Sequence, residues 1–259
     1  MSPAPHLLAI DVGNTQTVIG LFGGEEKIAS WRLGSVARRT TDELAILIEG
    51  LFRLSGIEMS VVKRVVISSV VPQIGPTLEE MSVCYFGVRP LVVGPGTKTG
   101  ISVKYDNPHE VGADRIVNAV AGFHHYGGPL IIVDFGTAIT FDAISRAGEY
   151  LGGAISPGFG VSLEALVERA ARLPRIEPAA PKSVIGKNTV HSIQSGMFFG
   201  YKGLIKGIVE QMKSELGGSA QVVATGGQSL LFSGREDIFD HIEPDLTLVG
   251  LRLIAERNP

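Results

Sequence analysis

The sequence predicts an α/β fold made of two related halves, each a mixed sheet flanked by helices. Residues 8–18 reappear with matching residue types at 131–141, an offset of 123 residues in a chain of 259. Each copy is an apolar strand that ends in Asp-x-Gly, passes through a tight turn and returns as a β-branched run, which is the pattern of a hairpin. The predicted domains are residues 1–127 and 128–259, with a hinge near Gly127, Gly128 and Pro129.

The elements that follow each hairpin also repeat in order. A third strand is expected at 27–33 and, at the same offset, at 150–156. Thr40 and Glu43 form a capping box ahead of apolar residues at helical spacing, which predicts a helix over 41–54. Apolar runs at 65–70 and 222–227 predict buried strands, the first of them parallel, and further helices are expected at 76–85, 114–124, 163–172, 190–216 and 246–256.

Composition and charge exclude several classes of protein. Glycine makes up 33 of the 259 residues, well above the usual 7% or so, but 44% of the chain is hydrophobic, so neither a collagen-like nor a disordered chain is expected. A net charge of −3 offers no basic field for a nucleic acid or an anionic membrane. The single Cys84, the absence of signal-peptide features at the start and the lack of a membrane-spanning stretch favour a cytoplasmic protein.

The first Asp-x-Gly turn has the residue types of a phosphate-binding hairpin. Gly13 lets backbone N–H groups approach a phosphate, and Asn14, Thr15 and Thr17 can add side-chain donors. Asp11, at the end of the strand, can orient a magnesium ion or its waters. The alternative is an ordinary hairpin in which Asp and Asn only form the turn. The second copy favours phosphate binding.

Two further places carry candidate residues. In the second turn, Asp134 could hold a cation or act as a catalytic base, and Thr137 could reach a phosphate, unless this is merely a capped turn. Asp114 stands where a helix is expected to start, and most aspartates there are only caps or first-turn acids. Arg115 beside it is unusual at the positive end of a helix unless it holds an anion, so the pair suits a general base next to a carboxylate clamp.

Taken together, the motifs resemble those of type III pantothenate kinases. The matching segments are Asp-Val-Gly-Asn-Thr at 11–15, the run from Tyr105 to Arg115, Asp-Phe-Gly-Thr at 134–137, and the segments 152–158, 186–189 and 224–227. These kinases are members of the actin-like (ribonuclease H-like) superfamily, with sugar kinases, acetate kinases and the Hsp70 ATPase. The resemblance implies two duplicated actin-like domains with a nucleotide cleft between them.

The resemblance also implies an activity and a set of site residues. It implies ATP-dependent phosphorylation of pantothenate to 4'-phosphopantothenate, the first step of coenzyme A biosynthesis, with Asp114 as general base. The implied cofactors are ATP with Mg²⁺ and a monovalent cation, K⁺ or NH₄⁺, at Asp134, and the family is typically homodimeric. The implied ATP contacts are Asp11, Val12, Gly13, Asn14, Thr15, Gln16, Thr17, Val18 and Thr137, and the implied pantothenate contacts are Tyr105, Gly112, Ala113, Asp114, Arg115 and Thr189.

Two alternatives stay open from the sequence. One is another actin-like phosphotransferase, such as a sugar kinase or a polyphosphate hydrolase. The other is a nucleotide-binding regulatory protein without catalysis on the same fold, because a fold does not fix a function.

Overall fold

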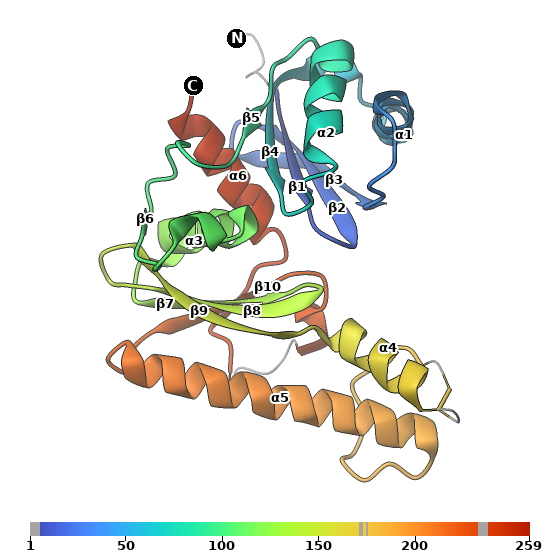
Figure 1. Cartoon of the computed structure of the whole chain (residues 1–259), viewed down its shortest axis with the longest axis vertical. Helices are drawn as coiled ribbons and strands as arrows, with labels where there is room; N and C mark the ends of the chain where they lie inside the picture. Colours follow the sequence, from blue (N-terminus) through green and yellow to red (C-terminus); the bar gives the residue numbers. More distant parts are fainter. Residues whose placement is uncertain (1–5, 171–172, 175, 233–237) are drawn as a thin grey trace. The chain divides into compact units, whose positions relative to one another are not determined.

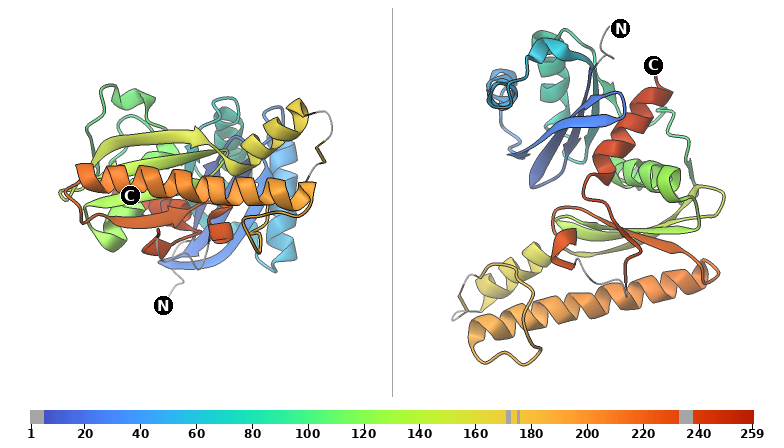
Figure 2. Two further views of the ribbon diagram at one scale, coloured as in Figure 1. Left: turned by 90° about the horizontal axis from the view of Figure 1, so that it is seen from below. Right: turned by 180° about the vertical axis from the view of Figure 1, so that it is seen from behind.

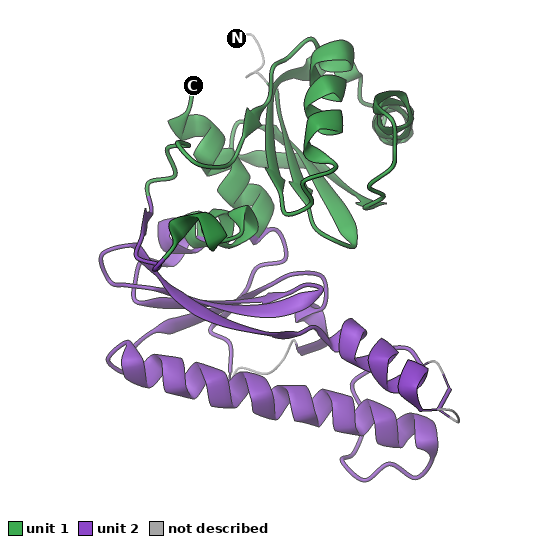
Figure 3. Ribbon diagram, in the orientation of Figure 1, with its two compact units in different colours: residues 1–100, 107–121, 247–259 green, residues 101–106, 122–246 purple. Residues whose placement is uncertain are grey.

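Two mixed β-sheets with flanking helices make up the protein, which confirms the predicted α/β class (Figure 1). The computed structural model describes residues 6–170, 173–174, 176–232 and 238–259. The chain divides into two compact units, coloured separately in Figure 3. Unit 1 comprises Met1–Gly100, Asn107–Ala121 and Thr247–Pro259, and unit 2 comprises Ile101–Asp106 and Gly122–Leu246.

The sheet of unit 1 has the strand order β3-β2-β1-β4-β5. Strands β1 and β2 form the predicted hairpin, β3 pairs antiparallel with β2, and β4 lies parallel to β1 and β5 parallel to β4. Apolar residues of β1, β2 and β4 are almost wholly buried and form the core with helix α1 (Thr41–Leu54). The bounds are β1 His6–Val12, β2 Gln16–Gly23, β3 Glu26–Gly34, β4 Val62–Ser69 and β5 Leu91–Val92.

The helices of this half begin and end close to where the sequence predicts. Helix α1, Thr41–Leu54, starts at the capping box, in which the Thr40 hydroxyl accepts from the Glu43 backbone N–H at 3.2 Å. Helix α2, Gly75–Met81, runs on into a π-helical turn, Ser82–Phe86, so the helix predicted over 76–85 changes its hydrogen-bond spacing part-way. Short 3₁₀ turns lie at Met59–Val61 and Pro108–Glu110.

The sheet of unit 2 repeats this topology. Its order is β11-β10-β7-β8-β9-β6, so β9-β8-β7-β10-β11 corresponds strand for strand to β3-β2-β1-β4-β5, with the same antiparallel and parallel pairs. The additional strand β6 pairs parallel with the far edge of β9. The bounds are β6 Ser102–Val103, β7 Leu130–Phe135, β8 Ala138–Ile144, β9 Glu149–Pro157, β10 Gln221–Thr225 and β11 His241–Ile242. The duplication predicted from eleven matching residues therefore extends through five strands.

Long helices flank the second sheet. Helix α5, Thr189–Glu215, lies along one face of it, and Phe198 and Ile205 of this helix are buried in the same core as Phe141 (Figures 1 and 2). Helix α4, Phe159–Arg169, begins four residues before its predicted start, while residues 171 and 172 of the prediction lie outside the described residues. A 3₁₀ turn, Ser229–Phe232, follows β10.

The C-terminal helix α6, Leu246–Arg257, contributes most of its residues to unit 1 rather than to the second half of the chain. It crosses helix α3, Ala113–Tyr126, so closely that a Cβ at Gly250 would lie 2.1 Å from the Val117 carbonyl oxygen. The Thr247 hydroxyl donates to Asn118 Oδ1 at 2.7 Å, and Arg64 donates to the Asn258 carbonyl at 2.8 Å. These contacts explain why the compact units differ from a single cut between residues 127 and 128. No helix in the described ranges is long and apolar enough to cross a membrane.

Candidate active site

The first Asp-x-Gly turn closes the β1–β2 hairpin and leaves three side chains exposed. Val12 pairs with Thr17, and the Gly13 N–H donates to the Gln16 carbonyl at 3.0 Å. A Cβ at Gly13 would stand 3.0 Å from that same oxygen, which makes the turn tight. Asn14, Thr15 and Gln16 are exposed, so this turn presents polar side chains on the surface of unit 1.

Thr17 has a different place from its neighbours in the turn. It is 7% exposed, and its hydroxyl is 2.9 Å from the Ser35 hydroxyl. The Ser35 N–H donates to the Thr15 carbonyl at 2.9 Å. Thr17 therefore ties the turn to the residue that follows β3, while the side chains of the three residues before it are exposed.

The second turn is one residue shorter than the first. Phe135 faces Ile139 across the hairpin, so residues 136–138 form the turn, whereas residues 13–16 form the first turn. The Gly158 N–H donates to the Thr137 carbonyl at 2.9 Å, just as Ser35 does to Thr15. Hydrogen bonding thus makes Thr137 the counterpart of Thr15, although the ungapped repeat in the sequence aligns it with Asn14. A Cβ at Gly158 would lie 2.3 Å from the Thr137 carbonyl oxygen, so this close approach needs glycine.

Asp134, at the end of β7, stands beside the end of β10. It is paired in register with Thr225, and a Cβ at Gly226 would lie 2.4 Å from Asp134 Oδ1. Gly226 also has φ +89°, which L residues with a side chain rarely adopt. The Thr225 hydroxyl is buried and has no hydrogen-bond partner among the described residues, as expected of an oxygen that completes the surroundings of a cation or a water.

The same arrangement occurs at the end of β1 in unit 1. Asp11 is paired in register with Ser68 of β4, and the Ser68 hydroxyl is buried without a hydrogen-bond partner in the described part of the chain. Each repeat thus places an aspartate and a buried hydroxyl on neighbouring strand ends. This donor set consists of oxygen atoms, which suits a hard cation such as Mg²⁺ or K⁺. Sequence reasoning does not identify Ser68 or Thr225 as site residues, although both lie in the runs 65–70 and 222–227 that predict strands.

Asp114 lies in the first turn of α3, and Gly112 makes room for its carboxyl group. A Cβ at Gly112 would stand 2.5 Å from Asp114 Oδ1, and the same oxygen accepts from the Arg115 N–H at 2.8 Å. Burial raises the pKa of the Asp114 carboxyl, and the Arg115 N–H and charge lower it by less. A carboxyl group with a raised pKa in a partly open position suits a proton acceptor that operates near neutral pH.

Within unit 1, the Asp11 turn and the Asp114 loop meet at the same edge of the sheet. The Val70 N–H, just after β4, donates to the Val12 carbonyl at 3.0 Å. A Cβ at Gly112 would be 3.7 Å from Val70 Cγ1. The carboxyl ends of β1 and β4 thus carry both the phosphate-type turn and the candidate base, although these residues are about a hundred positions apart in the sequence.

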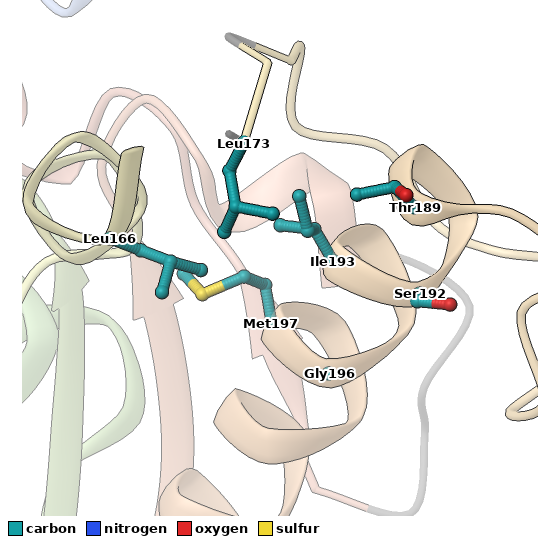
Figure 4. A pocket seen from close by; sticks show the side chains of 7 residues that line it. All are labelled: Leu166, Leu173, Thr189, Ser192, Ile193, Gly196 and Met197. Carbon is teal, nitrogen blue, oxygen red and sulfur yellow. The ribbon is translucent and has the colours of Figure 1, made fainter. Parts of the chain in front are cut away.

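Within unit 2, the predicted site residues lie in three places. Asp134 and Thr137 belong to the β7–β8 turn, and Tyr105 lies against Gly152 of β9, where a Cβ would be 3.3 Å from the Tyr105 ring. Thr189 begins α5 and lines a groove of about 490 Å³ between α4 and α5 (Figure 4). The other walls of this groove are mainly apolar, and none of the remaining predicted site residues lines it: its walls are Leu166, Leu173, Ser192, Ile193, Gly196 and Met197.

Comparison with known proteins assigns the family. A family model for type III pantothenate kinases matches residues 7–211. A protein from Geobacter sulfurreducens named type III pantothenate kinase is 53% identical over 252 residues, which cover 97% of this chain and 99% of the relative. This chain belongs to the type III pantothenate kinase family. The family phosphorylates pantothenate in coenzyme A biosynthesis, so the chain is a kinase by family.

Solved structures of low sequence identity support the fold of this family. A Campylobacter jejuni protein described as a Baf family transcriptional activator aligns with a TM-score of 0.61 at 18% identity, over 97% of this chain and 98% of that one. The polyphosphate/ATP-glucomannokinase of an Arthrobacter strain aligns with a TM-score of 0.50 at 12% identity, over 97% and 99% of the two chains. The predicted actin-like architecture of paired mixed sheets is confirmed.

Proposed function

We propose that this chain transfers the γ-phosphoryl group of ATP to the primary hydroxyl of pantothenate, with Asp114 as general base. The observation that carries the assignment of the base is the half-buried Asp114 carboxyl, for which the missing side chain of Gly112 makes room and whose pKa is raised. Membership of the type III pantothenate kinase family supports the substrate. The product is 4'-phosphopantothenate, and the reaction is the first step of coenzyme A biosynthesis.

The Asp114 carboxylate accepts the proton of the substrate hydroxyl as its oxygen attacks the γ-phosphorus. The bond from that phosphorus to the β,γ-bridging oxygen breaks, and ADP leaves with the electron pair. Phosphoryl transfer passes through a loose transition state, so the protein mainly positions the reactants and balances charge. Asp114 is held for this role because Oδ1 accepts from the Arg115 N–H, while the other oxygen can face the substrate.

ATP is expected to bind through the two Asp-x-Gly turns. In the first turn, Asn14, Thr15 and Gln16 have exposed side chains that can donate, Gly13 keeps the turn tight, and the buried Thr17 holds it through Ser35. In the second turn, the exposed Thr137 is the hydrogen-bonded counterpart of Thr15. The proposed ATP contacts remain Asp11, Val12, Gly13, Asn14, Thr15, Gln16, Thr17, Val18 and Thr137.

Pantothenate is a carboxylate with a primary hydroxyl and an amide, and the proposed contacts match these groups. Arg115 is 7% exposed, so its charge acts in a partly desolvated place where an anion would be held firmly. Tyr105 offers a ring and a phenol from the edge of the unit 2 sheet. Gly112 and Ala113 carry backbone groups at the start of α3, and Thr189 carries a hydroxyl at the start of α5.

Two cations are proposed beside the phosphates. Mg²⁺ would be oriented through Asp11 and would neutralise charge on the phosphates of ATP. A monovalent cation, K⁺ or NH₄⁺, would be held by Asp134 together with the buried Thr225 hydroxyl. Among the described residues, no group of three or more His, Cys, Asp or Glu could hold a metal ion, so single carboxylates with hydroxyl and phosphate oxygens are the proposed ligands.

We also propose that the chain acts as a homodimer in the cytoplasm. The groove between α4 and α5 is lined by apolar side chains, and Leu166 at its wall is 41% exposed, so a second copy has an apolar surface to cover. Light scattering should give the mass of two chains, and Leu166→Glu should shift it toward one. A monomer at micromolar concentration would contradict this proposal.

A coupled assay of ADP release tests the proposed function directly. We expect ADP release that depends on pantothenate and is far faster in potassium than in sodium at equal ionic strength. Turnover of hexoses without turnover of pantothenate would favour the sugar-kinase alternative. ATP binding with no pantothenate-dependent ADP release would favour a regulatory protein.

A further inference from the structure

A buried carboxyl group lies within the sheet of unit 2, in the strand β8 that follows the second Asp-x-Gly turn. Asp142 of β8 is 0% exposed. The Tyr150 hydroxyl donates to Asp142 Oδ1 at 2.8 Å, and the Thr140 hydroxyl donates to Asp142 Oδ2 at 3.1 Å. Tyr150 is itself 0% exposed. We call Asp142 and Tyr150 the carboxyl–phenol pair.

This pair is on the face of the sheet opposite to helix α5. Ile139 and Phe141 of β8 belong to the core cluster that includes α5. Successive side chains of a strand point to opposite faces, so Thr140 and Asp142 point away from that core. Burying a carboxyl group costs free energy unless it is fully hydrogen-bonded. A protein with an apolar residue of similar size in its place would often be at least as stable. A role beyond stability is therefore worth testing for Asp142.

The segment that carries Tyr105 is fixed to the strand that carries Tyr150. Strand β6 pairs parallel with β9 through Val103 and Tyr150, and the Lys104 N–H donates to the Tyr150 carbonyl at 2.8 Å. Lys104 Nζ is also 3.4 Å from Glu149 Oε1. Residue 105 thus follows directly after a segment anchored at position 150.

The Tyr105 ring is supported from two sides. Its centroid is 6.4 Å from that of the Tyr150 ring, with the planes tilted by 54°. A Cβ at Gly152 would lie 3.3 Å from Tyr105 Cε2, so the ring lies close over the backbone of β9. The pairing of β8 with β9 shifts between Ala143 and Ile144, a bulge that falls beside Gly152, whose φ is +124°. Bulges of this kind commonly redirect side chains next to functional sites.

We infer that the carboxyl–phenol pair positions Tyr105 for pantothenate. Asp142 fixes the Tyr150 hydroxyl, which fixes the ring, and the Tyr150 ring with the Gly152 bulge fixes the orientation of Tyr105. Asp142 and Tyr150 are positioning residues, because neither needs to touch the substrate. The inference rests on the proposed function, in which Tyr105 contacts pantothenate.

The test compares Tyr150→Phe with a matched control, Tyr126→Phe. Tyr126 also belongs to unit 2 and also donates from its hydroxyl to a carboxylate, Glu243 Oε1 at 2.5 Å, but it is not packed against Tyr105. We expect Tyr150→Phe to raise the KM for pantothenate about three- to tenfold, the usual effect of one lost hydrogen bond, with the KM for ATP unchanged. Tyr126→Phe should leave both KM values unchanged. Asp142→Asn, which keeps an acceptor for the phenol, should raise the pantothenate KM less than Tyr150→Phe does.

A double-mutant cycle separates positioning from a purely structural role. Tyr105→Ala should raise the pantothenate KM, and adding Tyr150→Phe to it should cause no further rise, because the two residues act through one contact. Additive effects, or a Tyr150→Phe variant that lowers Tm without changing KM, would overturn the inference. An unchanged pantothenate KM in Tyr105→Ala would remove Tyr105 from the proposed substrate site and would refute the positioning role with it. Normal pantothenate-dependent ADP release in that variant would leave the kinase function standing.

Discussion

Replacing Asp114 by asparagine removes the proposed base with little change of shape. The amide oxygen of the new side chain can still accept from the Arg115 N–H, as Asp114 Oδ1 does at 2.8 Å, and the side chain still fits over Gly112. What is lost is a carboxylate that can take the substrate proton. General-base catalysis contributes about 10²- to 10⁴-fold, so we expect kcat to fall by that factor, or by about 2.7–5.4 kcal/mol in activation free energy.

The same substitution should raise the stability of the protein at pH 7, although it lowers kcat. Because burial raises the pKa of Asp114, the folded protein holds this proton at pH values where the unfolded chain has lost it. The free energy of unfolding therefore falls as pH rises from the ordinary carboxyl value of 3.8 through the raised value, and stays lower above it. Asp114→Asn lacks this penalty, so its Tm should exceed that of the wild type at pH 7, and the difference should disappear below pH 3.8.

Stopped assays of ADP release measure the fall in kcat. Thermal unfolding at about pH 3.5 and about pH 7 measures the difference in Tm. Isothermal titration with ATP should give an unchanged Kd, because Asp114 is not among the proposed ATP contacts. Asp42→Asn is the matched control, since Asp42 is also a first-turn acid of a helix in unit 1 but is exposed. Residual kcat within about fivefold of the wild type would remove Asp114 from the role of base, whatever the Tm shows.

Three further predictions follow from single contacts. Gly226→Ala should lower the free energy of unfolding by about 1–3 kcal/mol, because Gly226 has φ +89°, and should weaken activation by potassium, because the new Cβ would lie 2.4 Å from Asp134 Oδ1. Gly227→Ala is the control: a Cβ there would have no atom within 4 Å, so unfolding and rate assays should show neither effect. Asp134→Asn should bring the rates in potassium and sodium together, and a preserved potassium preference would place the cation elsewhere. Gly250→Ala should lower Tm because its Cβ would lie 2.1 Å from the Val117 carbonyl oxygen, and an unchanged Tm would show that α3 and α6 can separate without cost.

Local sequence signals predicted the elements well because each rests on nearby residues. Thr40 and Glu43 cap α1 as their spacing requires, and the helix covers Thr41–Leu54 as predicted. The paired Asp-x-Gly turns predicted the duplication, which the strand orders confirm. The start of α4 was predicted four residues too late. Gly158, the residue before this helix, is held by close backbone contacts with the second turn, and no sequence pattern shows them.

Only part of the candidate active site could be predicted from the sequence. The turn residues and Asp114 have residue types and positions that suggest chemistry, and the family resemblance adds Tyr105 and Thr189. Ser68, Thr225 and the carboxyl–phenol pair lack such signals, because a hydroxyl or a carboxyl in a strand becomes notable only when its burial and partners are known.

The sequence by itself determined the repeated strand–turn–strand pattern, the helices and the family, because these depend on periodicity, caps and turn residues that are close together in the chain. Only the tertiary structure decided that Thr137 corresponds to Thr15, that α6 packs in unit 1, and that Tyr105 rests on Tyr150 and Gly152. Each of these depends on strand register or on contacts between residues distant in sequence. The one-residue difference between the two turns, for example, changes which residue corresponds to Thr15 without altering the local pattern.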